Sequence, residues 1–126
     1  MTIAYWCVLA AAALTYLATG LAKAGGRMPP NANHTPREWL EQLQGWPKRA
    51  HWAQQNGFEA FPLFAAAVII AGLAHAPQAR IDSVALAFIG CRVAYLILYL
   101  ADLSWLRTVA WICGVACCVW LFFLGA

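Results

Sequence analysis

Three polar side chains interrupt long apolar stretches of the chain. Asn56 and Glu59 lie in one stretch, and Arg92 lies in the next. If these stretches cross a membrane, a charge near the bilayer centre costs about 2.5–3.5 kcal/mol even on the translocon-insertion scale, so such residues face the interior of a helix bundle and are paired. The sequence therefore predicts a buried ion pair between Glu59 and Arg92.

The two charges are also expected at the same depth. Glu59 follows the start of its stretch, near residue 50, by nine residues, and Arg92 precedes the end of its stretch, near residue 101, by nine. At 1.5 Å per residue, both lie about 13–14 Å deep. The same antiparallel register brings three further pairs level: Asn56 with Tyr95, Trp52 with Tyr99, and Arg49 with Asp102. This polar ladder, open at one membrane face, serves either as internal glue for the bundle or as a binding site.

The rest of the chain has the composition of a membrane protein. Of its 126 residues, 63% are hydrophobic and 10% are charged, whereas a soluble domain carries about 25% charged residues. Four apolar runs, each long enough to cross a hydrocarbon layer as a helix, cover residues 3–22, 50–76, 83–101 and 108–125. We therefore predict an all-α fold, a single domain over residues 1–126 built as an antiparallel bundle of four transmembrane helices. The first run has no basic segment before it, which favours a retained span over a cleaved signal peptide.

Basic residues indicate how the bundle is oriented. They concentrate in the loop 23–49 and in the link after the third run: Lys23, Arg27, Arg37, Lys48, Arg49 and Arg107. The opposite side has only Arg80. Because Lys and Arg favour cytoplasmic loops, the loop 23–49 is predicted to be cytoplasmic and both termini non-cytoplasmic. The basic residues fall between apolar runs and not along one face, which argues against a nucleic-acid partner.

The loop 23–49 contains a predicted short amphipathic helix. Thr35, Pro36 and Glu38 are spaced as an N-cap, a first helical residue and a capping-box partner, and Gly45 and Pro47 are expected to end the helix. Its apolar face consists of Trp39, Leu40, Leu43 and Trp46. Such a helix either lies on the membrane in the headgroup layer or covers the mouth of a site as a lid.

Small residues indicate close helix packing. The alanine run 10–13 allows the first helix to approach a neighbour, and Gly114 and Cys118 form a small-xxx-small pair. All five cysteines lie in apolar stretches, without a CxxC pair or a Cys/His cluster. We therefore expect free thiols that act as small packing residues, and no metal site.

The polar residues of the second, third and fourth runs resemble the signature of the MAPEG family, the membrane-associated proteins in eicosanoid and glutathione metabolism. The matching positions are Arg49-Ala50, Gln54, Asn56, Glu59, Pro62, Gly90-Cys91-Arg92-Val93-Ala94-Tyr95, Tyr99 and Arg107-Thr108. The resemblance covers all four runs and is greatest to uncharacterised bacterial members. It implies a homotrimer in the bacterial inner membrane, with a site at each subunit interface.

The resemblance also implies a glutathione site near the cytoplasmic mouth. The positions that would bind glutathione are Asn56, Glu59, Arg92, Tyr95 and Arg49. Arg107, with Tyr99 beside it, would be catalytic, because a guanidinium next to the sulfur lowers the pKa of the thiol. The chain departs from the glutathione-using members at Trp52, where they commonly carry an arginine.

Two functions are compatible with these residues. The first is a glutathione-dependent transferase or peroxidase that acts on a lipophilic small molecule, an electrophile drawn from the membrane lipid. The second is a non-catalytic scaffold or lipid-binding protein of the same fold, in which Arg107 is simply a basic anchor at a helix end. The chain has no internal repeat, which argues against a transporter.

Overall fold

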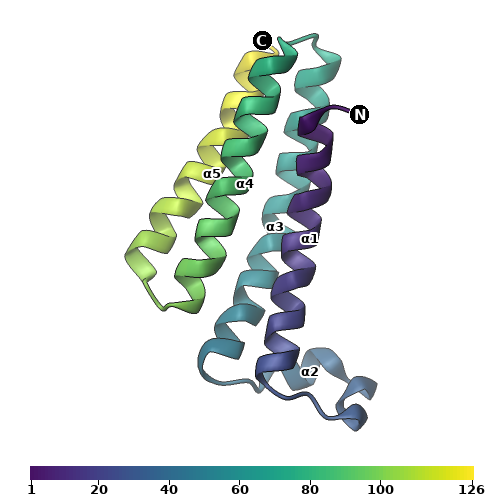
Figure 1. The fold of residues 1–126 in the computed structure, drawn as a ribbon, viewed down its shortest axis with the longest axis vertical. Coiled ribbons are helices and arrows are strands. Elements are labelled where there is room, and N and C mark those ends of the chain that lie inside the picture. Colours follow the sequence, from purple (N-terminus) through teal and green to yellow (C-terminus); the bar gives the residue numbers. More distant parts are fainter.

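Four long helices dominate the computed structural model, which describes all 126 residues. They are α1 (Ile3–Gly25), α3 (Gly45–Leu73), α4 (Gln78–Leu100) and α5 (Ser104–Leu124). Each is long and apolar enough to cross a membrane, so the predicted all-α fold with four spans is confirmed. Both termini lie at the end of the bundle opposite α2 (Pro36–Glu41) (Figure 1).

The helices begin before, or continue beyond, the apolar runs that predict them, whereas α3, α4 and α5 end one to three residues short of those runs. α3 begins at Gly45 and not at residue 50, α4 at Gln78 and not at 83, and α5 at Ser104 and not at 108. α1 likewise continues to Gly25, past residue 22. Hydrophobicity marks the part of a helix that suits lipid, whereas backbone hydrogen bonding continues through the polar residues on either side. The apolar runs therefore located the helices and missed their ends.

The loop after α1 holds a 3₁₀ helix (Pro30–His34) and α2, which is shorter than predicted. The predicted capping box is wrong, because the Thr35 side chain makes no capping hydrogen bond. Gly45 does not end this helix but begins α3 with a φ of 67°, and Pro47 follows in the first turn of α3, where its missing N–H is not needed.

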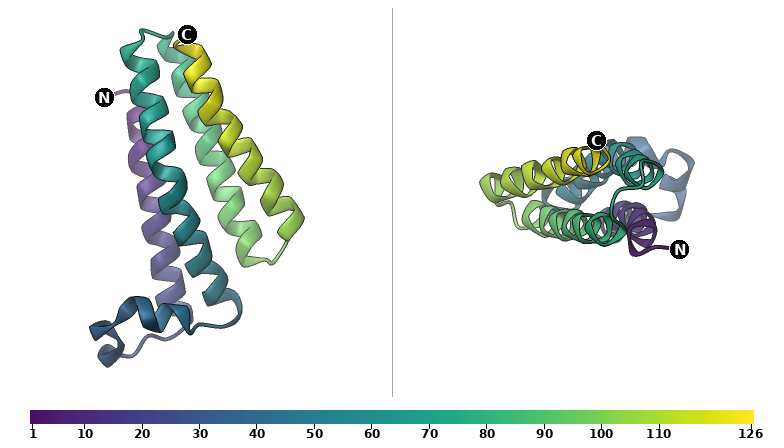
Figure 2. Two further views of the ribbon diagram at one scale, coloured as in Figure 1. Left: turned by 180° about the vertical axis from the view of Figure 1, so that it is seen from behind. Right: turned by 90° about the horizontal axis from the view of Figure 1, so that it is seen from above.

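α2 packs at the end of the bundle where α1 stops and α3 starts. Leu40 and Leu43 are buried against Ala22 and Ala50. The turn between α4 and α5 lies away from α2 in every view (Figures 1 and 2). This position does not support a lid over residues near that turn.

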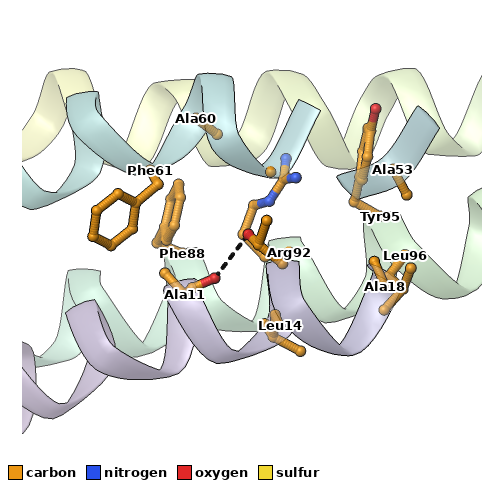
Figure 3. Close-up of a pocket in the computed structure, with 12 residues that line it drawn as sticks. Ala11, Leu14, Ala18, Ala53, Ala60, Phe61, Phe88, Arg92, Tyr95 and Leu96 are labelled. Carbon is orange, nitrogen blue, oxygen red and sulfur yellow. Dashed lines mark hydrogen bonds between the residues drawn. The ribbon is translucent and has the colours of Figure 1, made fainter. Parts of the chain in front are cut away.

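A stripe of small residues brings α1 and α3 together. The buried positions of α1 are Ala4, Cys7, Ala11, Thr15, Ala18 and Ala22. A Cβ on Gly57 of α3 would lie 2.5 Å from Thr15 Oγ1, so only glycine fits there. The predicted close approach of the alanine run therefore holds at Ala11, whose carbonyl also accepts the Thr15 hydroxyl hydrogen bond at 3.1 Å (Figure 3).

The core continues between α3, α4 and α5 at the end that holds the termini. Phe64 stacks on Phe88 with ring centroids 3.8 Å apart. Gly114 faces Phe88 and Cys91, and Cys118 is buried, as expected for a small-residue packing face. α5 lies against the other helices at this end and diverges from α3 towards the α4–α5 turn (Figure 2). The divergence opens the bundle beside the polar residues.

Candidate functional site

Two neighbouring hollows contain most of the predicted site residues. The outer hollow, of about 430 Å³, is bounded by α3 and α4, and its lining residues are Trp52, Gln55, Asn56, Glu59, Tyr95 and Tyr99. The Arg107 hollow, of about 220 Å³, adds α5, and its lining residues are Asn56, Tyr95, Tyr99, Arg107, Thr108 and Trp111. The two share Asn56 and both tyrosines, so they form one polar region with two compartments.

Arg92 contacts Asn56 and not Glu59. Its Nη1 donates to Asn56 Oδ1 at 2.9 Å, and Asn56 Nδ2 donates to Glu59 Oε2 at 3.3 Å. The predicted Glu59–Arg92 ion pair is therefore wrong: the amide of Asn56 stands between the two charges, and Glu59 is exposed in the single chain. The long Arg92 side chain instead reaches the residue one turn before Glu59 on α3.

The Arg92 side chain is enclosed between rings. Its guanidinium lies 4.3 Å from the Tyr95 ring centroid. Figure 3 shows the side chain extending from α4 towards α3, with Phe61 and Phe88 on one side and Tyr95 on the other. The cavity at its inner side holds only about 20 Å³, room for about one water. With Asn56 and Glu59, Arg92 also lines a hollow of about 180 Å³ between α3, α4 and α5. Arg92 therefore positions Asn56 and Tyr95.

Aromatic rings connect the two hollows. Trp52 and Tyr99 lie with centroids 6.4 Å apart, which confirms that these two positions are level. The Tyr95 and Tyr99 rings meet edge to face with centroids 5.5 Å apart, and the Arg107 guanidinium lies 4.3 Å from the Tyr99 centroid. A cation held on a ring face in this way is attracted by the ring quadrupole. Arg107 is thus held over Tyr99 at one side of its hollow.

The start of α5 at Ser104 determines which backbone groups lie next to Arg107. Because α5 begins at Ser104, the Arg107 N–H is already bonded to the Leu103 carbonyl at 3.0 Å. The Thr108 hydroxyl donates to the Ser104 carbonyl at 3.0 Å. The free N–H groups of the helix N-terminus therefore precede Arg107 in the sequence. The positive charge in this hollow comes from the guanidinium of Arg107.

Arg49 lies outside both hollows. Its Nε and Nη2 donate to the Leu100 carbonyl at 3.3 and 3.1 Å. The last carbonyls of a helix have no partner within the helix, so this arginine satisfies the end of α4. Arg49 makes no hydrogen bond with Asp102 in the single chain, and its contact with glutathione stays a prediction.

Glu41 forms a polar cluster that the sequence patterns did not predict. Its carboxylate contacts His51 Nε2 at 2.9 Å, Lys48 Nζ at 3.2 Å and Gln55 Nε2 at 3.2 Å. The hydrogen bond with His51, followed by that with Lys48, lowers the pKa of the Glu41 carboxyl. The three partners recur at three- or four-residue spacing on α3, but nothing in the sequence placed the α2 residue opposite them. The cluster adjoins the outer hollow through Gln55 and Trp52, which line that hollow. Lys48 Nζ lies 5.6 Å from the centroid of the Trp52 ring.

An apolar groove on α5 adjoins the Arg107 hollow. This α5 groove, of about 530 Å³, is lined only by hydrophobic residues: Trp111, Ile112, Val115, Ala116, Val119, Trp120 and Phe123. Trp111 lines both the groove and the Arg107 hollow. A lipophilic molecule in the groove would therefore have one end next to Arg107. No group of three or more His, Cys, Asp or Glu side chains is placed to hold a metal ion.

Residues 3–126 match the model of the MAPEG family. No curated protein sequence matches the chain.

Proposed function

Because the chain belongs to the MAPEG family, we propose that it is a glutathione-dependent transferase or peroxidase that acts on a lipophilic electrophile taken from the bilayer. The observation that carries the proposal is the Arg107 guanidinium, held 4.3 Å from the Tyr99 ring centroid at the point where a polar hollow meets the α5 groove. A nucleophile from water and an electrophile from lipid can meet at such a boundary.

Glutathione, as substrate, supplies the sulfur nucleophile. A thiol has an ordinary pKa of about 8.5, and an adjacent guanidinium lowers that pKa towards neutrality. Arg107 stabilises the thiolate for attack on an electrophilic carbon, so that a sulfur–carbon bond forms as the leaving group departs. Tyr95 and Tyr99 line the same hollow, and their hydroxyls would donate hydrogen bonds to charge that develops on the electrophile.

Titration calorimetry of the detergent-solubilised protein with glutathione tests the proposal. Wild type should bind glutathione and show thiolate absorbance in the ultraviolet. Arg107→Ala should retain most of the affinity and lose both the thiolate signal and conjugation of a chlorodinitrobenzene electrophile. Arg80→Ala, at the other end of the bundle, is the matched control. Absence of a thiolate signal at saturating glutathione, or unchanged turnover in Arg107→Ala, would contradict the mechanism.

A second candidate is a non-catalytic lipid-binding protein or membrane scaffold. The α5 groove favours it, because every lining residue is hydrophobic and the groove needs no thiol to be filled. A fluorescent acyl-chain probe distinguishes the two functions. Probe binding that Trp120→Ala weakens, with no heat of binding for glutathione, would favour the second candidate.

We also propose a homotrimer in a bacterial inner membrane, with both termini on the non-cytoplasmic side. Only 17% of the apolar window of α5 is buried in the single chain, so this helix needs lipid or a neighbouring subunit as its partner. Native mass spectrometry in mild detergent should give the mass of three chains. Alkaline phosphatase fused after Ala126 should be active in the bacterial periplasm, and an inactive fusion would reverse the proposed orientation.

A further inference from the structure

The thiols of Cys91 on α4 and Cys117 on α5 interact across the interface between the two helices. Both are free and only partly buried, whereas Cys7 and Cys118 are buried in the core. We propose that Cys91 and Cys117 form a redox-active pair, which a lipid hydroperoxide oxidises to a disulfide that joins α4 to α5. The pair uses the chain's own thiols and not those of a substrate, so this inference does not depend on the proposed function.

The backbones of α4 and α5 approach closely beside the pair. A Cβ on Gly114 would lie 3.7 Å from the Cβ of Cys91, within the range of about 3.5–4.5 Å that separates the two Cβ atoms of a disulfide. Cys117 follows Gly114 by three residues and therefore lies on the same face of α5. The two helices thus already have the separation that a disulfide between them requires.

The pair lies outside the hollows described above. Neither Cys91 nor Cys117 lines the two polar hollows, the hollow lined by Arg92 and Glu59, or the α5 groove. The next residue, Cys118, does line the hollow that contains Arg92, because consecutive residues of a helix point in different directions. A lipid or a neighbouring subunit that fills the α5 groove therefore need not contact the pair.

Both thiols lie deep within their membrane-spanning helices. Cys91 precedes Leu100, the last residue of α4, by nine residues, and Cys117 precedes Leu124, the last residue of α5, by seven. At 1.5 Å per residue, these separations are about 13–14 Å and 10–11 Å, measured from opposite ends of the bundle (Figure 1). Water-soluble oxidants are scarce at this depth, whereas an oxidised acyl chain carries its hydroperoxide group into the bilayer. A lipid hydroperoxide is therefore the class of oxidant that fits the pair.

The reaction proceeds in two steps. One sulfur attacks the terminal oxygen of the hydroperoxide, so that a sulfur–oxygen bond forms as the oxygen–oxygen bond breaks. The thiol proton goes to the departing alkoxide, which leaves as an alcohol, and the sulfur becomes a sulfenic acid. The second thiol then attacks the sulfenic sulfur, and the disulfide forms as water leaves. Two thiols thus supply the two electrons that reduce one hydroperoxide. A thiol in apolar surroundings gives up its proton reluctantly, so the reaction should be slow.

The full chain in phosphatidylcholine vesicles, treated with linoleic acid hydroperoxide, tests the proposal. Wild type should lose two of its five thiols, as measured with a maleimide after denaturation, and peptide mapping should find Cys91 linked to Cys117. One hydroxy acid should form for each disulfide. Hydrogen peroxide at the same concentration should react at least about tenfold more slowly, because its acyl chain concentrates the lipid hydroperoxide in the bilayer. An equal or faster reaction with hydrogen peroxide would overturn the assignment of a lipid oxidant.

Alanine variants attribute the oxidation to the pair. Cys91→Ala and Cys117→Ala should each abolish the disulfide, whereas Cys118→Ala, the matched control at the adjacent buried cysteine, should retain it. Oxidised wild type should unfold at a higher fraction of dodecyl sulfate than the reduced protein, and dithiothreitol in detergent should reverse that shift. A link through Cys113, a disulfide between two chains, or no loss of thiols in wild type would overturn the inference. The peptide map of wild type decides among these outcomes even if a variant fails to fold.

Discussion

The contact between Arg92 and Asn56 leads to a prediction that separates this structure from a direct ion pair. In a double-mutant cycle of Arg92→Met and Asn56→Ala, the coupling energy should be about 1–2 kcal/mol. A hydrogen bond to a charged group contributes about 1.5–3 kcal/mol in soluble proteins. Interhelical hydrogen bonds in a membrane protein average about 0.6 kcal/mol with a maximum near 1.7 kcal/mol. The 2.9 Å charge-assisted bond between these residues belongs in the upper part of the membrane range.

The second cycle, Arg92→Met with Glu59→Gln, should give a smaller coupling, below about 0.5 kcal/mol. Glu59 makes its hydrogen bond with Asn56 and none with Arg92, so its interaction with the guanidinium acts across the intervening amide. This differs from a buried pair, in which removal of one partner costs about 3–5 kcal/mol. Arg92→Met alone also loses the contact with Tyr95, worth about 0.5–2 kcal/mol, and that loss cancels in both cycles.

Unfolding in mixed micelles of a mild detergent and dodecyl sulfate provides the measurement. The chain has seven tryptophans, so fluorescence reports the transition, and helical circular dichroism should follow the same curve if unfolding is two-state. Coupling of Arg92 to Glu59 that equals or exceeds its coupling to Asn56 would refute the relay through the amide.

Three further predictions test the packing that positions the site. Gly57→Ala should destabilise the bundle by about 1–3 kcal/mol, the cost of overpacking, because the new Cβ would lie 2.5 Å from Thr15 Oγ1; Thr15→Ala should recover part of the loss in the same unfolding assay, and no recovery would place the strain elsewhere. Asp82→Ala should cost about 1 kcal/mol and increase amide hydrogen exchange in the first turn of α1, since its carboxylate accepts an N–H from that turn at 2.9 Å; unchanged exchange there would contradict this role. The hydrogen bond with His51 lowers the pKa of Glu41 in the folded state, so the contact of α2 with α3 through Glu41 should be fully present above the ordinary glutamate pKa of 4.5 and be lost as pH falls through the lower, folded-state pKa. Protease sensitivity of the α2 loop should therefore increase in acid, and Glu41→Gln should remove that dependence on pH. An equal dependence in the variant would assign it to another group.

The sequence alone determined the class of the protein and the location of its helices. Transfer of an apolar run into lipid depends on the composition of that run, so four spans could be recognised without knowledge of their neighbours. The polar residues were identified for the same reason, because a charge such as Arg92 inside such a run stands out wherever its partner lies. The signature that resembles the MAPEG family consists of the same polar positions, and the match of residues 3–126 to the family model confirms the family.

Only the tertiary structure decided which of these residues meet. One helical turn is about 5.4 Å long, and the long Arg92 side chain reaches Asn56, one turn before Glu59, as its partner. Which of the two residues it reaches depends on how the helices pack around it, and residue spacing does not encode that packing. Arg49 likewise meets Leu100 and not Asp102 because the free carbonyl at the end of α4 needs a donor. The partners of a polar side chain depend on distances between helices, and these are established only when the helices pack.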